Sequence, residues 1–194
     1  SDLDKPKDRL AEIVNATAAR GGKIIIPAFA VGRTQLLVYY LRELEDEGRI
    51  PVLPVAVDSP MGVEATRLYS KHRDDHDFDM QRVVNLQRNP LATRNFSLVQ
   101  GRGGSRALNA QQGSAIIISA SGMATGGRVL HHLAQWLPDP ASAVIFAGYQ
   151  LPGPREKIVD GEKEVRIHGQ IVPVRAHIES ISSLSSGRRR ESSC

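Results

Sequence analysis

Four short apolar runs restrict what this chain can fold into more than any other feature of its sequence. They cover residues 23–26, 53–57, 114–119 and 142–147. Ile and Val dominate them, and polar residues do not alternate with apolar ones. A strand of this kind is covered on both faces, which is typical of a parallel sheet between layers of helices. The apolar stretches are also far shorter than the roughly 18 residues that span a bilayer, so we expect no membrane segment.

Amphipathic helix patterns separate these runs. Apolar residues recur there at helical spacing. Gly21 and Gly48 follow the first two patterns, and we expect these helices to end there because glycine is common at the C-terminal end of a helix. The patterns cover residues 7–20, 33–47, 63–72 and 126–136. Strand, turn and helix therefore follow one another several times, which predicts an α/β fold: a mostly parallel β-sheet flanked by helices, with right-handed crossovers.

Two stretches of the chain depart from this rhythm. Residues 73–103 lose periodicity, so we expect loops and short elements there, followed by a brief helix at 105–111. Further along, the alternating segments 164–168 and 171–178 flank the dipeptide Gly169-Gln170. This arrangement predicts a C-terminal β-hairpin.

The last ten residues differ from the body of the chain, because they contain no apolar residue before Cys194. We therefore expect one domain over 4–184 and a disordered or non-native tail over 185–194. Cys194 is the only cysteine, which excludes a disulfide framework and a thiolate metal site. Such cysteine usage favours a reducing compartment, so we expect the chain in the cytoplasm.

Positive charge is concentrated in one segment although the net charge is only +4. Residues 82–106 contain arginines and no acidic residue. These arginines are Arg82, Arg88, Arg94, Arg102 and Arg106. A nucleic-acid backbone would be attracted to such a segment. A solvated loop is the simpler interpretation for any single arginine, and both interpretations stay open.

Three polar turns follow the predicted strands, at 27–35, 58–61 and 119–128. In parallel sheets ligands bind beyond the carboxyl ends of the strands, where helix N-termini expose unpaired N–H groups. Helix capping and turn geometry explain each turn taken singly, and for Ser59 capping is the preferred explanation. Three such turns together favour a groove that binds phosphate. The candidate RNA- or phosphate-binding residues are Arg33, Ser59, Ser121, Gly122, Gly127 and Arg128.

The histidines do not form a recognisable catalytic or metal site. His72 and His76 are four residues apart, but neither H-E-x-x-H nor H-x-H-x-D-H occurs in the chain. His131 and His132 are adjacent on a predicted helix, and helix packing or capping explains them. We expect no catalytic residue and no metal ligand in this chain.

Several motifs, taken in order, resemble the β-CASP domain of bacterial metallo-β-lactamase-fold ribonucleases, a family that includes the eukaryotic pre-mRNA cleavage endonuclease. The resemblance covers about residues 4–184. The motifs are P-A-F-A-V-G-R-T-Q at 27–35, D-S-P-M at 58–61, S-R-A-L-N at 105–109, I-I-I-S-A-S-G-M-A-T-G-G-R-V-L-H-H-L at 116–133 and F-A-G-Y-Q at 146–150.

The resemblance implies an endoribonuclease whose parent protein hydrolyses RNA phosphodiester bonds with two zinc ions and a water activated between them. In that family the zinc ions lie in a metallo-β-lactamase domain, and the β-CASP domain is inserted into it as a cap. The implied partners are single-stranded RNA, which lies in the cleft between the two domains, and the metallo-β-lactamase domain itself. A homo-oligomer is compatible with the sequence.

The chain departs from the family pattern at both joints. The H-x-H-x-D-H signature that precedes the inserted domain has no counterpart here. After 178–185 the family continues Ala-His-Ala-Asp, with a histidine proposed as general acid, whereas this chain reads Ser186-Gly187-Arg188-Arg189. The resemblance therefore implies an RNA-clamping domain separated from its metallo-β-lactamase part, without a cofactor of its own and inactive alone.

Two other interpretations stay open. The chain could be a non-catalytic interaction or scaffold module of an RNA-processing complex, which would capture a protein partner without binding RNA. It could also be a free-standing enzyme that uses the same turns for a phosphorylated small molecule. The absence of an acid/base pair makes this last interpretation the weakest.

Overall fold

The fold is seen in a computed structural model, which describes residues 4–71, 91–99, 101–122, 124, 126–147 and 158–181. The arginines Arg82 and Arg88, the histidines His72 and His76, and the tail expected over 185–194 lie outside these residues. Among the helices that the structure describes, none is long and apolar enough to cross a membrane.

A six-stranded parallel sheet forms the centre of the molecule, with the strand order β3-β2-β4-β1-β5-β8. The strands are β1 (Ile24–Pro27), β2 (Val55–Asp58), β3 (Phe96–Leu98), β4 (Ile116–Ser119), β5 (Ala143–Ala147) and β8 (His177–Ile181). Every residue of β1, β2, β4 and β5 is buried. This confirms the prediction that the apolar runs form strands covered on both faces.

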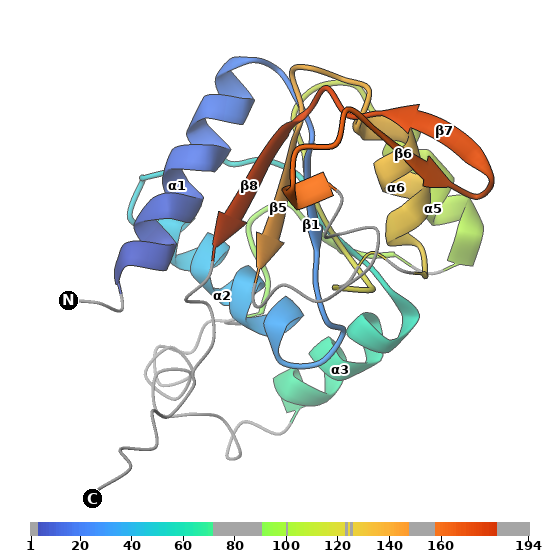
Figure 1. Cartoon of the computed structure of the whole chain (residues 1–194). Helices are drawn as coiled ribbons and strands as arrows, with labels where there is room; N and C mark the ends of the chain where they lie inside the picture. The colour runs from blue at the N-terminus through green and yellow to red at the C-terminus, as the bar shows by residue number, and fades with distance from the viewer. Residues whose placement is uncertain are drawn as a thin grey trace, which may run out of the picture.

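Helices cover both faces of the sheet (Figure 1). They are α1 (Asp4–Ala19), α2 (Arg33–Asp46), α3 (Pro60–Lys71), α5 (Gly101–Ala110) and α6 (Val129–Trp136). Successive strand residues point to opposite faces. Ile24 and Ile26 therefore belong to the core shared with α1, α2 and α3, whereas Ile25 belongs to the core shared with α6.

The C-terminal hairpin is also confirmed. β6 (Glu164–Ile167) and β7 (Gln170–Pro173) pair antiparallel around His168-Gly169, both of which have positive φ, at 49° and 76°. Positive φ at both central residues is what a tight type I′ hairpin turn requires.

The prediction that the second hairpin strand runs over 171–178 is wrong beyond Pro173. The backbone N–H groups of Arg175 and Ala176 both donate to the carbonyl of Leu137, at 2.8 and 2.9 Å. The N–H of His177 then donates to the carbonyl of Ser142, and β8 continues as a parallel neighbour of β5. Hydrogen bonds to distant residues thus carry the chain out of the hairpin and into the main sheet.

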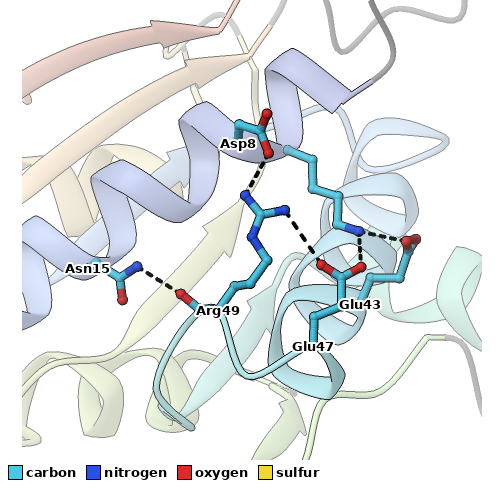
Figure 2. Close-up of polar contacts among 6 residues, drawn as sticks. Asp8, Asn15, Glu43, Glu47 and Arg49 are labelled. Atoms are coloured by element: carbon cyan, nitrogen blue, oxygen red, sulfur yellow. Dashed lines mark hydrogen bonds and ion pairs between the residues drawn. The ribbon is translucent and has the colours of Figure 1, made fainter. Parts of the chain in front are cut away.

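Ion pairs attach α1 to α2 near the end of α2 (Figure 2). The ammonium of Lys7 lies 2.7 Å from a carboxylate oxygen of Glu43 and 2.5 Å from one of Glu47. Arg49 pairs with Asp8 at 2.6 Å. Burial alone would lower the pKa of Lys7, but the two glutamates outweigh it and raise the pKa above its usual value. This network stabilises the pairing of the start of α1 with the end of α2.

Candidate nucleic-acid interface

The three polar turns singled out in the sequence meet at one edge of the sheet. β1 and β2 are both parallel neighbours of β4, so their carboxyl ends lie side by side. The N–H of Ala28 donates to the carbonyl of Ser119 at 3.0 Å, and the hydroxyl of Ser119 donates to the carbonyl of Asp58 at 2.7 Å. We call this edge the strand-tip surface; it comprises residues 28–33, 59–61, 120–122 and 126–128.

Arg33 opens α2 in the first of these turns. The N–H of Gly32 donates to Oε1 of Gln35 at 2.7 Å, which caps the helix, and Gly32 has φ 88°. The Nη1 atom of Arg33 is buried and has no hydrogen-bond partner among the described residues. A buried N–H without an acceptor costs free energy, so this guanidinium is suited to an acceptor brought by a ligand or a partner.

Ser59 is the N-cap of α3. It is buried, and its hydroxyl accepts a hydrogen bond from the N–H of Gly62 at 3.1 Å. Its carbonyl accepts from the N–H of Val63 at 2.8 Å. The structure thus gives the Ser59 hydroxyl the capping role that the sequence favoured when this residue was considered alone.

Glycines let the third turn approach its neighbours closely. A Cβ at Gly122 would lie 3.1 Å from the backbone nitrogen of Phe29, and one at Gly127 would lie 2.7 Å from the carbonyl oxygen of Ala120. Gly127 also has φ 77°, which favours glycine. Ser121 beside them is partly exposed.

The start of α6 offers backbone donors at this turn. The N–H of Val129 donates to the carbonyl of Ala120 at 3.0 Å. Within the part of the chain that the structure describes, the N–H groups of Gly127 and Arg128 have no acceptor. Unpaired N–H groups at a helix N-terminus attract anions.

A buried polar cluster lies beneath the strand-tip surface, and we call it the Asp58 cluster. The carboxylate of Asp58 is fully buried and accepts from three side chains. Nη1 of Arg128 lies 2.7 Å from Oδ1, while Nε2 of His132 and the hydroxyl of Ser105 each lie 2.5 Å from Oδ2. Asn109 completes the cluster, with Oδ1 at 2.7 Å from Nδ1 of His132.

The electrostatics of the cluster favour an ionised carboxylate. Burial alone would raise the pKa of Asp58, but hydrogen bonds from His132, Ser105 and Arg128 outweigh it and hold the pKa below its usual value. The neighbouring His131 is exposed. Burial and the charges of His132 and Arg106 lower the pKa of His131.

The sequence prediction missed the Asp58 cluster. The sequence pattern places Asp58 only in a turn, and it explains His132 by helix packing or capping. One signal was available: an aspartate that directly follows a buried strand must satisfy its charge with nearby donors. Arg128 and His132 are four residues apart, so they lie one helical turn apart on the same side of the chain.

The arginine-rich segment contributes partly to this region. Arg102 and Arg106 are exposed and belong to α5, the helix that brings Ser105 to Asp58. Arg94 is also exposed, but its backbone N–H donates to the buried carboxylate of Glu45 at 3.0 Å and so anchors the chain before β3. Burial is the main cause that raises the pKa of Glu45.

The residues described here do not fit a zinc centre. Within residues 4–71, 91–122 without Gln100, and the described parts of 124–181, no group of three or more His, Cys, Asp or Glu side chains is placed to hold a metal ion. Asp58 and His132 already bond to each other and to protein donors. None of the described residues is therefore assigned as a metal ligand.

Fold and site together define a class: an α/β domain whose parallel strands end in glycine-rich, arginine-bearing turns suited to anions. Its family is also clear. The chain belongs to the β-CASP domain family, because the model of the Beta-Casp domain matches residues 34–156. This confirms the resemblance seen in the sequence.

Curated relatives agree with this assignment. "Ribonuclease TTHA0252" of Thermus thermophilus is 35% identical over 175 residues, which are 90% of this chain and 40% of that protein. "Transcription termination factor FttA" of Methanosarcina mazei is 31% identical over 170 residues, 87% of this chain and 26% of that protein. The same factor of Methanothermobacter thermautotrophicus is 32% identical over 189 residues, 94% of this chain and 29% of that protein. The chain thus spans two fifths or less of these relatives.

Proposed function

We propose that this chain is the RNA-clamping domain of a metallo-β-lactamase-fold ribonuclease, and that its parent protein hydrolyses RNA phosphodiester bonds. The observation that carries the proposal is the meeting of three polar turns at one sheet edge, where a buried guanidinium N–H of Arg33 has no partner among the described residues. The relatives named as a ribonuclease and as a transcription termination factor support an RNA ligand.

Each candidate residue has a distinct role in this proposal. Arg33 and Arg128 supply guanidinium donors to backbone phosphates, and such charge-assisted hydrogen bonds are stronger than neutral ones. Gly122 and Gly127 let the phosphate approach the backbone N–H groups at the start of α6. Ser121 adds a partly exposed hydroxyl. Ser59 acts through the cap of α3, because Gly62 occupies its hydroxyl.

The catalytic step belongs to another part of the parent protein in this proposal. The family resemblance assigns hydrolysis to two zinc ions in a metallo-β-lactamase domain, which would face the strand-tip surface across the bound RNA. Exposed apolar side chains of Phe29, Val31 and Met61 support contact with a protein domain on this side. We place the domain over 4–184 and the protein in the cytoplasm. The chain alone is expected to contain almost no zinc by metal analysis and to leave single-stranded RNA uncleaved.

RNA binding by arginine variants tests the proposal. Filter binding of the chain to a single-stranded RNA oligonucleotide should be weak and should weaken further with salt. Arg33→Ala and Arg128→Ala should each lower the affinity roughly tenfold and reduce the salt slope by about 0.7, as expected for one lost phosphate contact on a single strand.

Arg49→Ala is the matched control. It removes one positive charge after the end of α2, whereas Arg33 lies at the start of that helix. Its RNA affinity should stay within about twofold of the parent chain, since exposed charges far from the ligand are screened. If Arg33→Ala and Arg128→Ala bind as tightly as Arg49→Ala, the strand-tip surface does not bind RNA. Capture of a protein partner without any RNA binding would instead favour the scaffold module.

A further inference from the structure

The hydrogen bonds around His132 determine which of its ring nitrogens carry protons. Nε1 of Trp136 is only a donor, and it lies 2.9 Å from Oδ1 of Asn109. The amide oxygen of Asn109, rather than its nitrogen, must therefore face Trp136. The same oxygen lies 2.7 Å from Nδ1 of His132. Because an amide oxygen only accepts, Nδ1 of His132 must carry a hydrogen.

The other nitrogen of His132 faces the Asp58 carboxylate. Nε2 lies 2.5 Å from Oδ2 of Asp58. Asp58 also accepts from Arg128 and Ser105, so its carboxylate is surrounded by donors, as an ionised carboxylate requires. An ionised carboxylate can only accept hydrogen bonds. Nε2 must therefore carry a hydrogen as well, and a ring with hydrogens on both nitrogens is an imidazolium.

We infer that His132 is held as a buried imidazolium, and that it acts with Asp58 as a positioning pair for Arg128 on the strand-tip surface. This inference rests on the proposed RNA-binding function. One carboxylate then faces two cations, so the Asp58 cluster keeps one net positive charge directly beneath the turns that we assign to phosphate. The pair fixes one edge of the Arg128 guanidinium, whose remaining N–H groups are left for a phosphate.

The charged neighbours of His132 come from several elements. Asp58 is the last residue of β2, and Arg128 directly precedes α6. His131 lies beside it on α6, with ring centroids 5.8 Å apart, and α5 contributes the cation Arg106 near His131. His168 of the hairpin turn also acts on His131. Asp58 is the anion of this group, and it pairs with Arg128 through Oδ1 and with His132 through Oδ2, so removing the imidazolium takes away one of the two cations that hold this carboxylate in place.

The protonation state can be measured directly. Long-range ¹H–¹⁵N correlation spectra of the ¹⁵N-histidine-labelled full chain near neutral pH should show both nitrogens of His132 protonated. His131 should show one unprotonated nitrogen in the same spectrum and serves as the internal reference. One unprotonated nitrogen on His132 would overturn the inference, whether or not the chain binds RNA.

RNA binding tests the positioning role separately. His132→Gln keeps a side-chain donor but no charge, and it should lower the affinity for the single-stranded RNA oligonucleotide roughly fivefold. The salt dependence of binding should also become weaker in His132→Gln, whereas His131→Gln, on the exposed neighbour, should keep both the affinity and the salt dependence of the parent chain.

The two tests distinguish the possible failures. If the parent chain binds no RNA, the proposed function fails, and the positioning role fails with it even where the spectra show an imidazolium. If the parent chain binds RNA and His132→Gln has the same affinity and salt dependence, only the positioning role is overturned. Should His132→Gln not fold, the NMR spectrum of the parent chain still decides the inference.

Discussion

Replacing Gly127 by alanine should destabilise the protein by pushing α6 away from the strand tips. The new Cβ would lie 2.7 Å from the carbonyl oxygen of Ala120 and 3.2 Å from its carbonyl carbon. Both contacts are to backbone, so no side chain can rotate to relieve them. The same carbonyl oxygen accepts the hydrogen bond from the N–H of Val129 that begins α6.

The expected magnitude follows from three contributions. A non-glycine residue at a left-handed φ costs about 1–2 kcal/mol. The steric overlap adds about 1–3 kcal/mol of strain. Displacing the Ala120 carbonyl weakens the bond from Val129, which contributes about 1 kcal/mol. We therefore expect Gly127→Ala to lower the free energy of unfolding by about 4 kcal/mol.

Gly113→Ala is the matched control, because Gly113 has φ 83° and a Cβ there would meet nothing within 4 Å. It carries the left-handed cost alone, so the expected loss is about 1.5 kcal/mol. Urea denaturation followed by circular dichroism measures both variants. Equal losses for Gly127→Ala and Gly113→Ala would refute the close approach of Gly127 to Ala120 as the reason for glycine at this position.

Two further predictions concern charged side chains. Lys7→Met should lower the free energy of unfolding by about 1 kcal/mol, a small value because Glu43 and Glu47 are partly exposed. While Glu43 and Glu47 are ionised, the raised pKa of Lys7 means that its contribution is complete below pH 10.5 and is lost as the pH rises above that value, so urea midpoints of the parent chain and Lys7→Met should differ at neutral pH and converge in alkali. Asp58→Asn should cost about 3 kcal/mol, because it leaves the buried His132 and the partly exposed Arg128 without the carboxylate that they share. The lowered pKa of Asp58 means that its contribution is complete above pH 3.8 and is lost as the pH falls below it; a constant gap between the two urea midpoints down to strong acid would contradict this.

The site was only partly predictable. The turns at 27–35 and 119–128 were identified from residue types, because glycine, arginine and hydroxyl side chains after a buried strand are a local signal. Asp58 and His132 were not joined, because 74 residues separate them. Nothing in the spacing of such a distant pair shows that the ends of β2 and α6 come into contact.

Local chemistry alone determined much of the fold. The apolar runs without polar alternation predict strands buried on both faces, and such strands are found. Gly169 predicts a tight turn, and it has the positive φ of such a turn. Element ends were less certain: α5 begins at Gly101 rather than at 105, and Gly104 within it lies so close to Val99 that a Cβ would meet its side chain at 2.7 Å. Glycine there serves packing, although in the sequence it suggested a loop.

Only the tertiary structure determines the strand order, the pairing of β8 with β5 in the main sheet and the contacts among the residues of the Asp58 cluster. β3 illustrates the reason: at the sheet edge its side chains stay partly exposed, so it leaves no apolar run to detect. Similarly, hydrogen bonds from the residues before and at the start of β8 to Leu137 and Ser142 direct this strand into the main sheet. The alternation of residues within 171–178 contains no signal for these bonds. Periodicity and turn chemistry are properties of neighbouring residues, whereas strand pairing and buried charge networks depend on which distant segments meet.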